Sequence, residues 1–307
     1  MTRYGVIDLG SNTFHLLIVE YLGNNSFETI FRESVFTSLS DGGIDIIKQE
    51  RIDFGIETLH RFKEILLSHK CSHIRVIGTA ALRTAKNRAI FIDKAEMVLG
   101  SKIEVIDGPK EAHYIFKGIT LLPEMLSGSH LIMDIGGGST ECILLVNGKN
   151  IFSKSYPIGV GALHEKFHNH EPITSNEIEQ IKQFILHQIS DLIPFIQAYS
   201  PQYLTGAAGS FEILELMSGK ELTLKSVSHV DIATFTHLYD KIISADIEQR
   251  KNMPGLPIER IKLIVVGMIW KKILFDLVNP SQILVCPYAL KEGILIEMIE
   301  ESSNTNA

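Results

Sequence analysis

Cysteine is scarce in this sequence, and the three that occur, Cys71, Cys142 and Cys286, stand far apart. An odd and widely spaced set excludes a disulfide framework and the paired spacing of a zinc site. Apolar runs are also short, because none reaches the roughly 18 residues that a membrane-spanning helix needs. No charged segment followed by an apolar stretch opens the chain. We therefore expect a cytoplasmic protein with no membrane partner.

An excess of positive charge and the familiar nucleotide-binding motifs are missing as well. The net charge of −7 argues against a broad nucleic-acid-binding surface, so we expect no nucleic-acid partner. A local basic groove for an anionic ligand remains compatible with this charge. Neither G-x-G-x-x-G nor G-x-x-x-x-G-K-[ST] occurs. Their absence excludes the Rossmann and P-loop folds, whose glycine loop leads directly into a helix.

One pattern is present twice. An apolar strand at residues 4–7 ends in Asp8, followed by a small polar loop and a second strand at 14–21. Residues 131–133, Asp134 and a strand at 141–146 repeat that order, and each unit continues into a third strand. A chain of 307 residues is long enough for two domains with separate cores. The repeat therefore predicts two related α/β domains, in which a strand rather than a helix follows each loop.

The two loops have the composition of phosphate-binding turns. Glycine and small hydroxyl residues let backbone N–H groups converge on phosphate oxygens without bulky side chains in the way. Taken alone, either loop is equally consistent with an ordinary tight turn, but the duplication favours phosphate binding. The candidate residues are Gly10, Ser11, Asn12 and Thr13 in the first loop and Gly136, Gly137, Gly138, Ser139 and Thr140 in the second.

Acidic residues border both loops and suggest a metal site. Asp8 and Asp134 precede the loops, and Glu141 follows the second one. Carboxylates bind Mg²⁺ together with retained waters and substrate phosphates. The alternative for each acid is a residue at a strand end that accepts loop N–H bonds. We predict Mg²⁺, or another divalent cation, held by Asp134, Glu141 and Asp8.

A family resemblance becomes visible in five stretches: "VIDLGSNTFHLLI", "VIGTAALRTAKN", "IDGPKEAHYIFKGI", "DIGGGSTE" and "LTGAAGS". Their order and spacing resemble the exopolyphosphatase and guanosine pentaphosphate phosphohydrolase (Ppx/GppA) family, over residues 3–296. The resemblance implies the short, two-domain form of an α/β fold with two duplicated actin-like (ribonuclease H-like) domains and an interdomain cleft. The implied domains are 1–124 with about 288–307, and 125–287. It also implies a homodimer.

The resemblance implies roles for four further residues. Glu111 in "GPKEA" matches the base that activates water, and a carboxylate at a helix start after a tight turn suits that task. The alternative is an acid favoured by the helix macrodipole. Arg83 matches an arginine that contacts phosphate through its planar guanidinium; a surface salt bridge is the alternative. Gly209 and Ser210, in "GAAGS" at 206–210, match a phosphate-binding turn.

The implied activity is hydrolytic release of the terminal phosphate from inorganic polyphosphate, with pppGpp as the alternative substrate. An ATP-dependent kinase and a non-hydrolytic nucleotide sensor of the same superfamily are further alternatives. Three positions depart from the family pattern and affect substrate preference: Lys110, Ala162 and Lys262.

The remaining patterns are interpreted as structural. We expect "HNHE" at 168–171 to be a solvated loop and not a metal site. We expect Trp270 in the core, and Lys271 with Lys272 on a solvated helix face.

Overall fold

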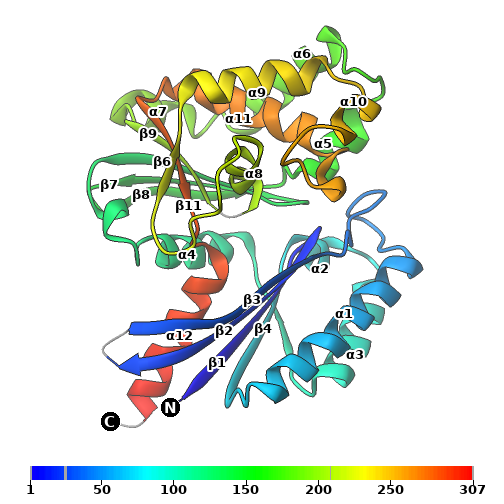
Figure 1. Ribbon diagram of the computed structural model, residues 1–307, viewed down its shortest axis with the longest axis vertical. Coiled ribbons are helices and arrows are strands. Elements are labelled where there is room, and N and C mark those ends of the chain that lie inside the picture. The colour runs from blue at the N-terminus through cyan, green and yellow to red at the C-terminus, as the bar shows by residue number, and fades with distance from the viewer. Residues whose placement is uncertain (1, 24–25, 208, 306–307) are drawn as a thin grey trace. The chain divides into compact units, whose positions relative to one another are not determined.

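The computed structural model describes residues 2–23, 26–207 and 209–305. The chain forms two compact units, Met1–Gly118 with Leu290–Ala307 (unit 1) and Ile119–Ala289 (unit 2). Each unit contains one mixed sheet and its own helices (Figure 1). The predicted fold class of two actin-like α/β domains is confirmed, and the predicted domain boundaries stay a prediction.

The sheet of unit 1 has the strand order β3-β2-β1-β4-β5. β1 (Arg3–Leu9), β2 (Thr13–Gly23) and β3 (Ser26–Phe36) form an antiparallel meander, and β4 (His73–Gly78) and β5 (Ile103–Val105) extend it in parallel. β1 is buried from Tyr4 to Leu9 because it lies in the middle of the sheet. This burial explains why the strand reads as a continuous apolar run up to Asp8.

Five helices accompany this sheet among the described residues. α1 (Gln49–Ser68) packs on α3 (Arg88–Leu99), and α12 (Leu290–Thr305) runs beside β1 (Figure 1). α2 (Ala80–Thr84) and α4 (Gly108–Ile119) follow β4 and β5. α12 contacts α4 closely at Gly293, where a Cβ atom would lie 1.8 Å from the carbonyl oxygen of Tyr114.

The sheet of unit 2 has the order β10-β11-β9-β6-β7-β8. β6 (Ser129–Ile135), β7 (Thr140–Val146) and β8 (Lys149–Tyr156) repeat the antiparallel meander. β9 (Tyr203–Ala207) and β11 (Gln282–Cys286) continue in parallel, and β10 (Ser228–Val230) adds an antiparallel edge. The predicted repeat of three strands is therefore present in both sheets.

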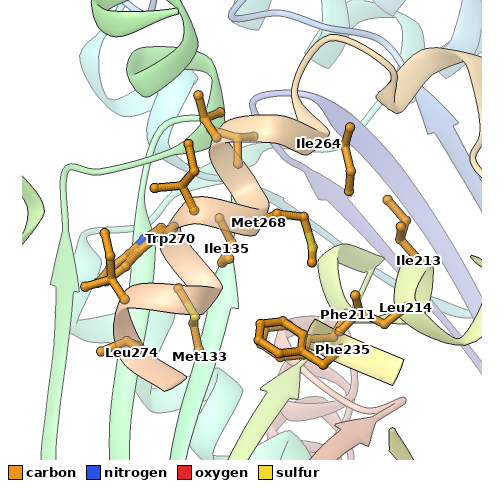
Figure 2. Packing of buried hydrophobic residues seen from close by; sticks show 14 of the residues in the cluster. Met133, Ile135, Phe211, Ile213, Leu214, Phe235, Ile264, Met268, Trp270 and Leu274 are labelled. Atoms are coloured by element: carbon orange, nitrogen blue, oxygen red, sulfur yellow. The ribbon is translucent and has the colours of Figure 1, made fainter. Parts of the chain in front are cut away.

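α11 (Ile264–Val278) is the central helix of unit 2. It is buried from Ile264 to Lys271 and over much of its last two turns, because most of its side chains are apolar. Figure 2 shows Trp270, Met268 and Leu274 of α11 among side chains of β6 and α8. Trp270 is fully buried, so its predicted place in the core is confirmed. The helices around it are α5 (Val160–Phe167), α6 (Ser175–Gln188), α7 (Ile193–Tyr199), α8 (Gly209–Met217), α9 (Ile232–Ser244) and α10 (Ile247–Lys251), with 3-10 turns at Pro123–Leu126 and Ile258–Arg260.

In the described ranges, no helix combines the length and the apolar character needed to cross a membrane.

Candidate active site

The first loop is held so that part of its backbone faces outward. The N–H of Gly10 donates to the carbonyl of Thr13 at 3.1 Å, which closes the turn. The carbonyls of Ser11 and Asn12 accept N–H bonds from residues 40 and 38, at 3.0 and 2.9 Å. In a trans peptide, a C=O and the following N–H point in opposite directions. The N–H groups of Asn12 and Thr13 therefore point away from the 38–40 segment, as a phosphate-binding turn requires.

The side chains of this loop are anchored in the same way. The hydroxyl of Ser11 accepts the N–H of Ala81 at 3.0 Å, at the start of α2. The Oδ1 atom of Asn12 accepts the hydroxyl of Ser40 at 2.6 Å. The Nδ2 group of Asn12 is buried without a hydrogen-bond partner among the described residues. A buried donor in that condition is costly unless an acceptor reaches it, and a phosphate oxygen would be one.

The second loop repeats this arrangement. The N–H of Gly136 donates to the carbonyl of Ser139 at 2.9 Å. The carbonyls of Gly136 and Gly137 accept N–H bonds from Val160 and Gly161, at 3.0 and 2.9 Å, in the first turn of α5. By the same peptide geometry, the N–H groups of Gly137 and Gly138 point away from α5. Within the described part of the chain, no protein group accepts from either of them.

Gly159 lets α5 approach this loop. A Cβ atom at Gly159 would lie 2.2 Å from the carbonyl carbon of Gly137 and 2.3 Å from the nitrogen of Gly138. No side chain fits in that space, so glycine at 159 is a condition for the observed loop.

The hydroxyl of Thr140 is already hydrogen-bonded within unit 2. Its hydroxyl donates to the carbonyl of Ile158 at 2.5 Å and accepts the indole N–H of Trp270 at 3.1 Å. A hydroxyl has one hydrogen to donate, and a phosphate oxygen needs a donor. The side chain of Thr140 therefore stabilises the loop, and we assign the proposed side-chain and backbone contacts to phosphate to the other residues of the loop.

The two acids of unit 2 face each other across β6 and β7. Asp134 and Glu141 are directly opposed residues of the antiparallel pair, so their side chains lie on the same face of the sheet. Glu141 is 2% exposed, and its Oε1 accepts the hydroxyl of Ser155 at 2.6 Å from the next strand. The row Asp134, Glu141 and Ser155 thus crosses three strands.

Unit 1 contains the matching row. Asp8 is opposed by His15, and His15 by Ser34, with 2.7 Å between Nδ1 of His15 and the hydroxyl of Ser34. His15 in unit 1 therefore stands where Glu141 stands in unit 2. The two rows therefore differ in charge, since unit 1 has a histidine where unit 2 has a carboxylate.

The composition of the unit 2 row fits a Mg²⁺ ion. No group of three or more His, Cys, Asp or Glu side chains suited to a metal is found among the described residues. Two opposed carboxylates nevertheless match the usual protein share of a Mg²⁺ shell, which waters and substrate phosphates complete. Asp8, the third predicted ligand, belongs to unit 1.

In unit 1 the buried Glu111 forms an ion pair with the partly exposed Arg83. Glu111 lies in the first turn of α4, and its Oε2 is 3.0 Å from Nη1 of Arg83. The same Nη1 also donates to the carbonyl of Ile106 at 2.9 Å. Burial raises the pKa of the Glu111 carboxyl, and the charge and hydrogen bond of Arg83 act in the opposite direction. The net rise makes Glu111 a stronger proton acceptor than an exposed glutamate.

Gly209 and Ser210 begin α8, and Ser210 is buried. The hydroxyl of Ser210 has no hydrogen-bond partner among the described residues. Ala208, in the same turn, lies outside the described residues.

Two interpretations of charged segments are corrected by the structure. The side chain of His168 is 1% exposed and packs beside His164, so "HNHE" is a solvated loop only in part; His170 is 69% exposed. Lys271 is buried, whereas Lys272 is paired with Asp276 at the surface. The apolar residues around Lys271 in the sequence were the available signal, because a largely apolar helix buries most of its surface.

The topology of both units, with an acid and an outward-facing loop after the first strand of each meander, places the chain among the actin-like proteins. The chain belongs to the Ppx/GppA phosphatase family, whose sequence model matches residues 18–302.

Two solved structures resemble the chain along its whole length. The exopolyphosphatase of Cytophaga hutchinsonii ATCC 33406 is 30% identical, with 98% of each chain covered and a TM-score of 0.92. The PPX-GPPA enzyme of Aquifex aeolicus is 23% identical, with 96% of this chain and 99% of the other covered and a TM-score of 0.79. The likeness to the Aquifex aeolicus enzyme shows the fold alone.

A curated relative is longer. The guanosine-5'-triphosphate,3'-diphosphate pyrophosphatase of Vibrio vulnificus (strain YJ016) is 30% identical over 307 residues. The match covers 97% of this chain and 59% of the relative, so the chain spans less than two thirds of that protein.

Proposed function

We propose that the chain is a phosphoanhydride hydrolase that releases the terminal phosphate of inorganic polyphosphate by attack of water. The observation that carries this proposal is the buried Glu111, whose pKa is raised while Arg83 keeps it oriented. A carboxylate whose pKa is raised accepts a proton from water more readily than an exposed glutamate does. The likeness to an exopolyphosphatase over 98% of both chains supports polyphosphate as the substrate.

In the proposed reaction, Glu111 takes a proton from water while the water oxygen attacks the terminal phosphorus. The P–O–P bond breaks, and the products are orthophosphate and a chain shortened by one phosphate. The outward N–H groups of the loops at 10–13 and 136–139 bind non-bridging oxygens, and Asn12 adds its buried amide. Such fixed donors supply electrostatic stabilisation without reorganising during the reaction.

Asp134, Glu141 and Asp8 would hold the Mg²⁺ ion, which screens phosphate charge when bound. Ser155 fixes the carboxylate of Glu141 by its hydrogen bond. Positioning of this kind typically matters for metal affinity.

A second candidate function is hydrolysis of the 5'-phosphate of pppGpp. The specific observation in its favour is the 30% identity to the Vibrio vulnificus pyrophosphatase. The homodimer belongs to the same proposal, since the family resemblance implies it, and sedimentation of the purified chain tests it.

One assay separates the candidate functions. The purified chain is incubated with Mg²⁺ and polyphosphate, pppGpp or ATP, with and without an alcohol acceptor, and free phosphate is quantified. We expect release from polyphosphate without acceptor, and loss of release when EDTA removes the metal. Release from pppGpp alone selects the second candidate, and transfer to the alcohol selects a kinase. Binding without release or transfer selects a sensor, and either of the last two results overturns the hydrolase.

The matched variants are Glu111→Gln and Glu104→Gln. Both remove one carboxylate, but Glu104 is a partly exposed partner of Lys110. Only Glu111→Gln should lower the rate of phosphate release, by the factor expected for loss of a general base.

A further inference from the structure

A small cavity lies inside unit 2 beneath the second loop. It measures about 20 Å³, and its lining includes Ile135, Val160, Ser210, Arg260 and Lys271. Ile135 is the residue before the loop, and the N–H of Val160 bonds to the loop carbonyl of Gly136. About 10 to 15 Å³ of such space holds one water. The cavity therefore has room for one or two oxygen atoms beside the phosphate loop.

Lys271 brings an uncompensated cation to this cavity. Its side chain is 1% exposed, and its ammonium lies 5.1 Å from the centre of the Phe211 ring. Among the described residues it forms no ion pair or hydrogen bond. Burial, together with the charge of Arg260, lowers the pKa of Lys271 to about 7. A buried charge is costly without a counter-charge, so the site favours an anion.

Two more donors line the same cavity. The buried hydroxyl of Ser210 has no hydrogen-bond partner among the described residues. Burial lowers the pKa of Arg260, while Glu212 and Glu259 act in the opposite direction. Among the described residues, the two acids affect the pKa of Arg260, whereas no acid is found that affects the pKa of Lys271. The cavity consequently offers an ammonium, a guanidinium and a hydroxyl to one ligand.

The ammonium of Lys271 lies close to Gly267. Gly267 stands one helical turn before Lys271, and a Cβ atom there would lie 3.8 Å from Nζ of Lys271. A long helical side chain points back along the helix, so its end group lies over the preceding turn. Gly267 also lines the cavity, so the end group of Lys271 lies at the cavity wall.

We propose that Lys271, with Arg260 and Ser210, forms an anion-binding pocket inside unit 2 that takes the oxygens of one phosphate group. The size of the cavity admits one edge of a phosphate and excludes a nucleoside. The ligand is free orthophosphate or the terminal phosphate of a short chain, which share this chemistry. Binding can be measured without turnover, so the pocket does not depend on the proposed hydrolysis.

The test is calorimetric titration of the full chain with orthophosphate, and separately with tripolyphosphate, in EDTA and at constant ionic strength. We expect Lys271→Met to weaken binding at least tenfold, because it keeps the volume and removes the charge. Lys272→Met is the matched control, since Lys272 is the next residue of α11 and is paired with Asp276. It should bind as the unchanged chain does. Orthophosphate binding assigns the pocket to the free ion, and binding of tripolyphosphate alone assigns it to the chain end.

Ser210→Ala is the second variant, in case Lys271→Met disturbs the fold. It removes only a hydroxyl and should weaken binding several-fold. Glu111→Gln should keep full binding while it loses hydrolysis, which separates this proposal from the proposed function. The pocket is overturned if neither anion binds in EDTA, or if both the Lys271 and the Ser210 variants bind as the unchanged chain does.

Discussion

Arg83 and Glu111 are 28 residues apart in the chain, yet Nη1 of one lies 3.0 Å from Oε2 of the other. The sequence had given them separate tasks, phosphate contact and general base. The ion pair means that Arg83 also affects the proposed base, because the guanidinium limits the rise in the pKa of Glu111 that burial causes. The net direction is upward, so burial has the larger effect.

Glu111→Gln should lower kcat by about 10²- to 10⁴-fold, the usual contribution of a general base. The melting temperature should not fall at neutral pH. Because the pKa of Glu111 is raised in the folded protein, its ionisation lowers the free energy of unfolding as the pH rises through that pKa. A neutral amide of the same size does not ionise, so the variant does not show this loss. Phosphate release and thermal unfolding measure the two effects. Turnover at the unchanged rate would remove Glu111 from the role of base.

Arg83→Met should move the acid limb of the kcat/KM profile to higher pH. The active form of Glu111 is the carboxylate, and activity falls as the pH drops through its pKa. Loss of Arg83 removes the effect that lowers this pKa, so protonation begins at a higher pH. The profile is recorded between pH 5 and 9, with Arg61→Met, at a partly exposed ion pair with Glu33, as control. An unmoved limb with a raised KM would leave Arg83 as a phosphate contact only.

Glu141→Gln should raise the Mg²⁺ concentration needed for half-maximal activity by at least about tenfold. The amide keeps the bond from Ser155 but lacks the negative charge that binds the ion. Ser155→Ala should have a smaller effect in the same direction, since it only frees the carboxylate to turn. Glu179→Gln, on an exposed position of α6, is the charge-matched control. An identical Mg²⁺ dependence in the Glu141 variant would exclude it as a ligand.

Gly159→Ala should destabilise unit 2 by about 1–3 kcal/mol, the usual cost of overpacking. Its methyl group would overlap the backbone of Gly137 and Gly138, so the second loop must shift and phosphate release should fall. Gly267→Ala is the control for stability: its methyl would lie 3.4 Å from Val160, an ordinary contact. Denaturant unfolding and the release assay measure both variants. Full activity in Gly159→Ala would show that the loop tolerates displacement.

Stability should fall in two separate steps as the solution is acidified. Burial and the neighbouring His168 lower the pKa of His164 to about 4, so its contribution is lost between its unfolded value of 6.5 and 4. Glu177 is buried, but hydrogen bonds from Thr174 and Asn169 lower its pKa to about 2, so its contribution is lost between 4.5 and 2. Urea unfolding from pH 2.5 to 8 should show the upper step flattened in His164→Gln and the lower one in Glu177→Gln. A single step left unchanged by either variant would contradict this assignment.

Short-range pattern was sufficient for much of the fold. The alternation of apolar runs with "GSNT" and "GGGST" predicted both strand–loop–strand units, and the structure contains them at the expected residues. Asp134 and Glu141 were grouped as metal ligands, which stays a prediction; the structure shows that they oppose each other across β6 and β7. The row that matches His15 to Glu141 was not predicted, since it needs the register of the third strands.

The amino-acid sequence by itself determined where strands, loops and helix starts occur, because these depend on neighbouring residues. Only the tertiary structure decided that the Thr140 hydroxyl supports its own loop, that Lys271 is buried while Lys272 is not, and that Arg83 meets Glu111. Burial and pairing decide what a polar group can do, and both depend on residues that are distant in the chain.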